Sequence, residues 1–588
     1  MKKGLILLLT AALLLAAMPA MAEDAPSSSI ELTHRMGNGI NLGNTMEACD
    51  ASLRGVVDGE PAYYETLWGQ PVTTREMIRW LKESGFDTIR IPVAWMTNAT
   101  HLGRGEGDFT ISEAYMDRVD EIVGWAIDEG MYVILNDHWD GSWWGMFGSD
   151  SPETRALAME AYKGMWTQIA ARFEKYDYHL IFESANEELG SRFDENSVLY
   201  CGDSIDHYLS DNERYALCNE VNQAFVDTVR AAGGNNGTRY LLIAGYGTNI
   251  EQTCNSRFVM PADTAEDKLL ISVHCYSPWS YCGASSARSA TQWGTKDHFE
   301  SLDREMKMMT KFSAQGIGVV IGEYGVLPGG SGNEPKDNAV TYHRYFLDLC
   351  DYYDYVPVLW DCSGYYVRKD LSYLDREMAD LYLARRAANE PADYAGVRAA
   401  AKADMDALTA EAPDSFRDDA IEMTDDTVVA WIMWSSGDWA LSYSVGDTYT
   451  PDSMSPGIVP TDVVIEGAGT YTVALDFTGT ENGFSNSVIF SAVGLSNAEV
   501  VHPGWAIHIQ EVKINGEPYH LAGRPYTTSD DGRCTRVNLY NEWVTKFPDD
   551  ARCLYGPTMN ISAVVLDRSD EIFSHIETIE VTFVYGPK

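Results

Sequence analysis

Basic residues are scarce in this chain of 588 residues. It has 43 lysines and arginines against 87 aspartates and glutamates, which gives a formal net charge of −44. A nucleic acid or an anionic membrane would be repelled by such a protein, so we expect neither as a partner. The charge suits a soluble protein that acts on an uncharged ligand.

Several sequence patterns are also missing. None of the ten cysteines forms a C-x-x-C pair, which leaves a zinc ribbon or a thioredoxin-like redox site unsupported. Neither H-x-H nor H-E-x-x-H occurs, so we expect no metal and no cofactor. There is no internal repeat and no low-complexity tract, and 45% of the residues are hydrophobic, which excludes a globally disordered chain.

The N-terminus has the features of a secretory signal. Lys2 and Lys3 precede an apolar run over residues 5–17, which is too short to span a bilayer. The small residues Ala20 and Ala22 form a cleavage site. We therefore predict a signal peptide over residues 1–22, a secreted extracellular protein and no membrane attachment after cleavage. A retained N-terminal anchor is the alternative.

The cysteines fit an oxidising destination. Their pairing cannot be fixed from the sequence, and buried free thiols are the alternative. Three pairs are close enough in sequence to staple loops: Cys201 with Cys218, Cys275 with Cys282, and Cys534 with Cys553.

Residues 23–386 alternate short apolar runs with longer amphipathic stretches. The apolar runs are rich in Val, Ile and Leu without strict alternation, as is typical of strands covered on both faces. Eight such strands are predicted: Gly39–Gly43, Thr88–Val93, Tyr132–Asn136, Leu180–Glu183, Tyr240–Ala244, Leu269–Val273, Gly318–Ile321 and Val356–Trp360. Helices are predicted over Thr73–Ser84 (with a capping box from Thr73 to Glu76), Glu113–Glu129, Pro152–Lys175, Asn212–Ala232 and Lys296–Gln315. This order predicts an α/β fold, a (β/α)8 TIM barrel.

The remainder of the chain has a different character. Residues 387–425 are Ala-rich and charged, which indicates a helical linker. Residues 426–588 contain short alternating segments separated by turns such as Asn515-Gly516. We predict an all-β sandwich domain there.

Polar side chains lie at or just after the C-terminal ends of the predicted barrel strands. In a (β/α)8 barrel these strand ends meet on one rim, where barrel enzymes carry their catalytic groups. Two of these side chains are carboxylates, Glu187 and Glu323. Such a pair suits cleavage of a glycosidic bond, in which one acid protonates the leaving group while the other attacks or activates water. Aromatic side chains suit the C–H faces of sugars. The full set is Arg90, His138, Asn186, Glu187, His274, Tyr276, Glu323 and Trp360.

Five segments together resemble glycoside hydrolase family 5, and within it the bacterial endo-β-1,4-glucanases. The resemblance covers roughly residues 30 to 385 and is carried by Asn41-Leu42-Gly43-Asn44-Thr45, Glu65-Thr66-Leu67-Trp68-Gly69, Thr88-Ile89-Arg90-Ile91-Pro92-Val93, Phe182-Glu183-Ser184-Ala185-Asn186-Glu187 and Ile321-Gly322-Glu323-Tyr324-Gly325. It implies a retaining mechanism with Glu187 as general acid/base and Glu323 as nucleophile, about 5–5.5 Å apart. It also implies that Asn186 binds the sugar 2-hydroxyl in the −1 subsite.

The same resemblance implies supporting roles. Arg90 and Tyr276 would hydrogen-bond the nucleophile and keep it ionised, and His274 would influence the protonation of the acid. His138 would line the −1 subsite, with Trp360 as its stacking platform. The loop after the third strand departs from the family, because Trp139 follows His138 where a second His is frequent.

Three aromatic residues in that loop, Trp139, Trp143 and Trp144, suggest a subsite wall, with packing of a long loop as the alternative.

In the sandwich, Trp434 and Trp439 flank a Ser-Ser-Gly-Asp turn. We expect both to be exposed beside this turn and name them as candidates for accessory sugar binding, so the sandwich is predicted to be a carbohydrate-binding module. A stabilising domain with core tryptophans is the alternative.

The sequence thus predicts a secreted, monomeric, retaining endo-β-1,4-glucanase that cleaves plant cell-wall β-glucan by double displacement. A xyloglucanase, mixed-linkage glucanase, xylanase or mannanase stays open on the same scaffold. Two other functions also stay open. One is a non-catalytic carbohydrate-binding protein, and the other is a metal-dependent hydrolase that would use His138, His274 and Asp137.

Overall fold

The computed structural model describes most of the chain in segments. These are residues 25–49, 61–98, 109–140, 143–194, 209–283, 292–328, 335–388, 393–416, 421–451, 454–523, 526–528, 532–544, 552–553 and 565–587. The predicted signal peptide, residues 1–22, lies outside them.

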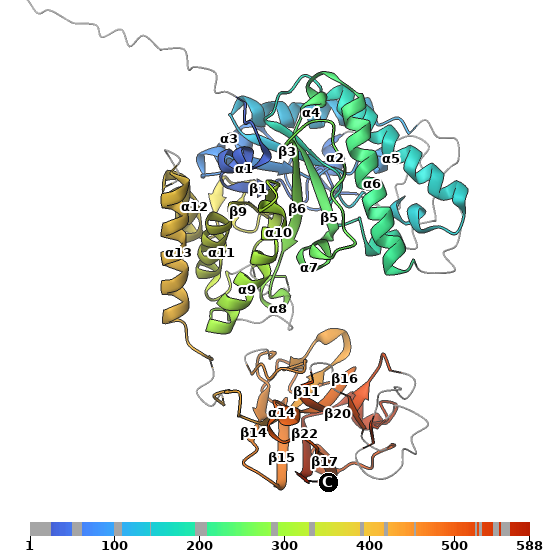
Figure 1. Ribbon diagram of the computed structural model, residues 1–588, viewed down its shortest axis with the longest axis vertical. Coiled ribbons are helices and arrows are strands. Elements are labelled where there is room, and N and C mark those ends of the chain that lie inside the picture. Colours follow the sequence, from blue (N-terminus) through green and yellow to red (C-terminus); the bar gives the residue numbers. More distant parts are fainter. Residues whose placement is uncertain are drawn as a thin grey trace, which may run out of the picture.

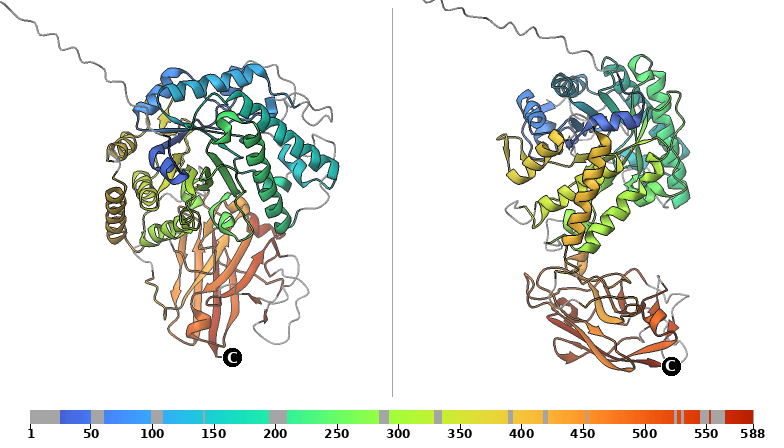
Figure 2. Two further views of the ribbon diagram at one scale, coloured as in Figure 1. Left: turned by 45° about the horizontal axis from the view of Figure 1, so that its top comes forward. Right: turned by 60° about the vertical axis from the view of Figure 1, so that its left-hand side comes forward.

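Eight parallel strands close into a barrel in chain order, as Figures 1 and 2 show. They are β1 (Gly39–Asn41), β2 (Thr88–Ile91), β3 (Tyr132–Asn136), β4 (Leu180–Glu183), β5 (Leu241–Asn249), β6 (Leu269–Cys275), β7 (Gly318–Tyr324) and β8 (Tyr355–Leu359). The predicted barrel is confirmed. Residues of β2, β3, β4 and β7 are buried throughout, which explains their continuous apolar character.

Helices surround the barrel near the predicted positions: α3 (Arg75–Glu83), α4 (Glu113–Asp128), α5 (Pro152–Arg172), α6 (Asp211–Ala231), α9 (Lys296–Met308) and α10 (Thr310–Ser313). Helix α11 (Ala339–Tyr353), between β7 and β8, was not predicted from the sequence. The predicted capping box at Thr73 is wrong. The Thr74 side chain caps α3 by accepting from the Met77 N–H. The Thr73 N–H instead donates to Glu65 at 2.7 Å, so the helix begins one residue later.

Further helices pack on the barrel. Helix α1 (Ser29–Met36) was not predicted from the sequence, and its Leu32 and Met36 are buried against the strands. After α12 (Arg376–Ala388), the Ala-rich stretch forms α13 (Tyr394–Glu411). Figure 1 shows α13 beside α11.

The C-terminal region has two antiparallel sheets, drawn in orange to red in Figure 1. The first runs in the order β12 (Ser442–Tyr443), β11 (Val429–Ser435), β16 (Phe490–Leu495), β20 (Thr535–Asn541), β19 (Tyr526–Thr528) and β21 (Arg552–Cys553), with β14 (Val463–Val464) also paired to β11. The second runs β13 (Val459–Thr461), β15 (Gly469–Asp476), β22 (Thr578–Pro587), β17 (Trp505–Ile514) and β18 (Glu517–Pro518). The predicted sandwich architecture is confirmed.

One tryptophan of the sandwich lies elsewhere than expected. The prediction that Trp434 is exposed is wrong, because its exposed fraction is 0%. It lies within β11, between β12 and β16, and its ring packs against Phe477 at 5.2 Å between centroids. The turn that suggested exposure begins only after this strand, and Trp439 lies beyond the turn, 40% exposed.

The suggested staple between Cys275 and Cys282 does not form, because both side chains are buried free thiols. Cys218 is a buried free thiol as well, and Cys534 is buried. The suggested partners Cys201 and Cys553 lie outside the described side chains. Within the described segments, no helix is both long and apolar enough to cross a membrane.

Candidate active site

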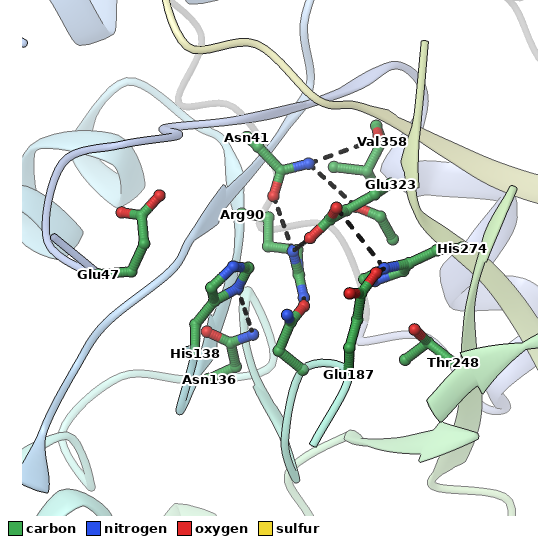
Figure 3. Close-up of polar contacts among 12 residues, drawn as sticks. Asn41, Glu47, Arg90, Asn136, His138, Glu187, Thr248, His274, Glu323 and Val358 are labelled. Atoms are coloured by element: carbon green, nitrogen blue, oxygen red, sulfur yellow. Dashed lines mark hydrogen bonds and ion pairs between the residues drawn. The ribbon is translucent and has the colours of Figure 1, made fainter. Parts of the chain in front are cut away.

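Arg90 lies at the centre of the C-terminal rim of the barrel, fully buried on β2 (Figure 3). Its guanidinium donates to Glu183 at 2.7 Å, to Glu323 at 2.9 Å and to the side-chain oxygens of Asn41 and Asn186 at 2.9 and 2.8 Å. One side chain thereby fixes residues from β1, β4, β7 and the loop after β4. The two buried carboxylates compensate the buried positive charge.

Glu323 lies near the end of β7 and has three partners. Arg90 bonds one oxygen, the Tyr276 hydroxyl donates to the other at 2.9 Å, and His274 Nδ1 lies 3.6 Å away. Burial raises the pKa of Glu323 above its ordinary value, and the charges of His274 and Arg90 and the hydrogen bond from Tyr276 oppose that rise by favouring the ionised form. Gly322 allows this packing, because a Cβ there would lie 2.9 Å from Ser272 Oγ.

Glu187 follows β4 and is the more open of the two carboxylates, with a side chain 44% exposed. Its Oε1 lies 2.8 Å from His274 Nδ1. One oxygen of each glutamate and one His274 nitrogen lie within 4.8 Å of one another. Figure 3 shows Glu187, His274 and Glu323 directed toward one another.

The three groups are electrostatically linked. Burial, the largest single effect, raises the pKa of Glu187, but the hydrogen bond and charge of His274 together with the charges of Arg90 and Arg192 bring the pKa below its ordinary value. Burial lowers the pKa of His274, but the charges of Glu323 and Glu187 outweigh it and raise the pKa above its ordinary value. Both directions favour a proton on His274 beside an ionised Glu187, 2.8 Å away.

His138 and Trp360 form one wall of the site. Their rings are stacked, with centroids 5.6 Å apart and planes at 11°. Burial lowers the pKa of His138 well below its usual range, and the nearby Arg90 charge adds to this effect, so the ring is neutral at neutral pH. A cleft of about 410 Å³ is lined by Glu47, Trp68, His138, Trp139, Asn186, Glu187, Glu323 and Trp360.

All eight barrel residues predicted for the site therefore gather at one rim. Structural carboxylates of the site, among them Glu183 and Glu47, were not predicted from the sequence. Glu183 is fully buried and accepts from Arg90, from Asn136 at 2.9 Å and from Ser272 at 2.6 Å. Glu47 accepts the Thr45 N–H at 2.8 Å, and burial raises its pKa to about 7. The sequence did offer one signal for Glu183, because a carboxylate stands at the end of an apolar strand there.

The tryptophans of the β3 loop divide into two groups. Trp143 and Trp144 are fully buried, stack at 4.5 Å and contact Tyr162, as expected for loop packing. Trp139 is 46% exposed at the cleft, and the Arg192 guanidinium lies 4.3 Å over its ring.

Glu188 connects this loop to the loop after β4. It accepts the backbone N–H of Trp139 at 2.8 Å and that of Asn186 at 2.6 Å, and pairs with Arg192 at 3.1 Å. We call Glu188, Arg192 and Trp139 the loop clamp. Burial raises the pKa of Glu188 to about 7, against the effect of Arg192 and the backbone bonds.

Glu187, His274 and Glu323 are the group within the described segments whose ligand atoms are close enough to hold a metal ion. The positive guanidinium of Arg90 lies 2.9 Å from Glu323, and it opposes a second cation beside that carboxylate. The arrangement suits proton transfer and nucleophilic attack by carboxylates better than metal ligation.

Comparisons with known proteins agree with this geometry. Residues 49–365 match the family model described as cellulase, glycosyl hydrolase family 5. Endoglucanase A of Paenibacillus barcinonensis is 34% identical over 388 residues, which cover 61% of this chain and 89% of that protein. A GH5-4 broad-specificity endoglucanase from an uncultured bovine rumen ciliate superposes with a TM-score of 0.52 at 32% identity, covering 61% of this chain and 98% of that one. A GH5 lichenase from Caldicellulosiruptor sp. F32 gives a TM-score of 0.53 at 30% identity, covering 61% and 95%.

Proposed function

Because this chain belongs to the cellulases of glycoside hydrolase family 5, we propose that it is a retaining endo-β-1,4-glucanase that hydrolyses β-glucan. The observation that carries the proposal is the chain of contacts from Arg90 and Tyr276 through Glu323 and His274 to Glu187. It joins the carboxylate that we propose as nucleophile to the carboxylate that His274 can supply with a proton.

In the first step, Glu323 attacks the anomeric carbon. The glycosidic bond breaks as Glu187 gives its proton to the departing oxygen, which leaves as a free hydroxyl of the shortened chain. The short distance between the two glutamates supports direct attack, because it leaves little room for an intervening water. Arg90 and Tyr276 stabilise the ionised form of Glu323 before attack.

In the second step, Glu187 acts as a base. It takes a proton from a water that attacks the anomeric carbon of the glycosyl ester, and Glu323 leaves as a carboxylate. Two inversions give net retention. The Glu187 side chain is half-exposed, which supports access of water at this stage.

His274 supplies the proton that Glu187 needs. The 2.8 Å contact allows direct transfer from Nδ1 to the carboxylate as the glycosidic oxygen approaches. Asn186 is held by Arg90 and has an amide available for the 2-hydroxyl. Trp360 and the neutral His138 present the wall against which the −1 sugar packs.

Hydrolysis of a panel of polymers tests the proposed function. Carboxymethyl cellulose, mixed-linkage glucan, xyloglucan, xylan and mannan would be incubated with the wild-type chain and with Glu323→Gln. We expect reducing-sugar release from β-1,4-linked glucans with the wild type alone. Release by both proteins would refute the nucleophile, and activity only on xylan or mannan would refute the substrate class.

We further propose that the protein is secreted and acts as a monomer on plant cell-wall polysaccharide. The charged, apolar and small-residue pattern of residues 1–22 supports export. N-terminal sequencing of protein from the culture medium should begin at Glu23, and light scattering should give the monomer mass. An intact N-terminus or a dimer mass would contradict these two expectations.

A further inference from the structure

Two tryptophans on the sandwich are exposed side by side. Trp439 is 40% exposed and Trp543 is 57% exposed. Their rings lie 5.9 Å apart between centroids, with planes at only 19°. Each ring therefore keeps much of its surface open although it faces the other.

The sheet brings these residues together from segments about a hundred positions apart. Ser435 of β11 pairs with Phe490 of β16, which pairs with Asn541 of β20. Because β11 and β20 both run antiparallel to β16, the loops that follow them leave the sheet at the same end. A register shift in the β16–β20 ladder lies just before this end, where bulges commonly redirect side chains.

The backbone of Trp439 is also unusual. Its φ is 58°, a left-handed conformation that a bulky residue adopts only when its surroundings impose it. Backbone bonds impose it here, since the Trp439 N–H donates to Ser436 O at 2.8 Å and the Gly437 N–H donates to Ser487 Oγ at 2.6 Å.

The sandwich core does not need this pair. Trp431 and Trp434 of the adjoining strand β11 are fully buried and belong to the core. Trp439 and Trp543 lie outside that core and expose apolar area to water, which is unfavourable unless something binds there. Their position therefore points to a ligand.

The surroundings indicate the chemistry of that ligand. Glu542, next to Trp543 in the chain, forms a 2.9 Å ion pair with Arg568, and both side chains remain partly exposed. Flat rings beside accessible hydrogen-bonding groups match a pyranose, which has apolar C–H faces and hydroxyl edges. The net charge of −44 disfavours a polyanion.

We propose that Trp439 and Trp543 form a carbohydrate-binding platform for a neutral β-glucan chain, separate from the catalytic cleft. The choice of β-glucan rests on the proposed function. A second attachment point on the same polymer raises the local concentration of the catalytic groups. The benefit falls on long or insoluble chains, because a short oligosaccharide cannot occupy both sites.

Binding without turnover tests the platform. Two full-length proteins would be run in native gels that contain mixed-linkage β-glucan. Both carry Glu323→Gln, and one also carries Trp439→Ala and Trp543→Ala. The retardation of each protein by the glucan measures its binding. We expect affinity to fall about tenfold. A Trp439→Phe/Trp543→Phe variant should keep most of the binding, and Val500→Ala, an exposed sandwich residue, should be unchanged.

Equal retardation of the Ala variant and its parent would overturn the platform, as would equal loss in the Phe and Ala variants. Thermal unfolding checks that the sandwich is intact, and Trp543→Ala alone serves if the double variant does not fold.

The platform and the proposed function can fail separately. In the active background, the double Ala variant should hydrolyse cellotetraose at the wild-type rate but release less sugar from insoluble cellulose. If no protein hydrolyses glucan but retardation still depends on the two tryptophans, the proposed endoglucanase activity is refuted and the platform is not. An equal loss on both substrates would refute the platform.

Discussion

Glu187 and Glu323 are chemically identical side chains with different surroundings. Glu323 is nearly enclosed and bonded by Arg90 and Tyr276, whereas Glu187 is half-exposed and, within the described part of the chain, bonded by His274 alone. Different surroundings allow one group to stay ionised while the other exchanges a proton with the substrate. The two roles can therefore be tested independently.

Replacing Glu187 by Ala should impair the proton-dependent step selectively. We expect kcat for cello-oligosaccharides to fall about 10²–10⁴-fold, because their leaving groups need protonation. An activated aryl cellobioside should lose far less in its first step, which pre-steady-state release of the phenol measures. An equal loss on both substrates would contradict the acid role.

Replacing His274 by Gln should change the pH profile of kcat/KM. The raised pKa of His274 lets the wild type retain the shared proton to higher pH. Without the imidazole that proton must sit on a carboxyl group, so the basic limb should move to lower pH. His179→Gln, at a partly exposed histidine outside the site, is the control. An unchanged basic limb would exclude His274 as the proton donor to Glu187.

The barrel residues of the site were predictable because each follows an apolar run in a short motif. Glu183 was missed since its importance comes from partners distant in the chain, such as Arg90 and Ser272. Glu47 bonds to the nearby Thr45, but its burial comes from the fold and no local motif marks it. Trp434 was placed wrongly for a related reason. Its turn signal is local, whereas its burial depends on the strands and side chains packed against β11.

At the scale of elements, the loop clamp holds the β3 loop against the loop after β4. Glu188 receives two backbone N–H groups and the charge of Arg192 in a fully buried position. The backbone of Trp139 has a φ of 61°, which these contacts maintain. The clamp therefore keeps Trp139 at the cleft and Asn186 beside Arg90.

The clamp should make stability depend on pH. The pKa of Glu188 is about 7 in the folded protein against an ordinary 4.5, so the folded state keeps a proton that the unfolded chain loses between these values. The Glu188 contribution to the free energy of unfolding is present below pH 4.5 and is lost as pH rises through 7, by up to about 3 kcal/mol.

Glu188→Gln removes this titration. Its free energy of unfolding relative to wild type should therefore rise between pH 4.5 and 7, whatever the fixed cost of its altered hydrogen bonds. Denaturant titrations at several pH values measure the difference, with Glu160→Gln on the exposed face of α5 as control. A pH-independent difference would show that Glu188 does not titrate in this range.

The strands and helices of the barrel were predictable because both follow an apolar periodicity. The first and last residues of these strands and helices were less predictable. β5 and β7 extend beyond the apolar run into Asn249 and Tyr324, since ladder bonds continue where polar site residues begin. The start of α3 was missed by one residue, because Thr73 and Thr74 are equivalent by type and only the Glu65 contact separates them.

On the scale of the whole molecule, the barrel and the sandwich have separate hydrophobic cores. The buried clusters of the barrel share no residue with the cluster formed by residues 428–585. Separate cores are the hallmark of domains that can fold alone. The sequence predicted this division from the change between helical and alternating patterns.

Deleting the sandwich should spare the chemistry. A chain ending at residue 425 keeps α13, whose Ala401 and Met405 are buried, and should hydrolyse cellotetraose within about twofold of the wild-type kcat/KM. Calorimetry should show one transition in place of two. Loss of folding in the shortened chain would show that the sandwich stabilises the barrel.

Double displacement requires that Glu323 forms a covalent bond with the sugar. A 2-deoxy-2-fluoro cellobioside with a good leaving group slows the second step and traps the ester, which peptic digestion and mass spectrometry would locate. We predict a single fluorocellobiosyl group on the peptide containing Glu323, and none in Glu323→Gln. A label on another residue, or turnover of a natural glucan to an inverted anomer, would contradict the account.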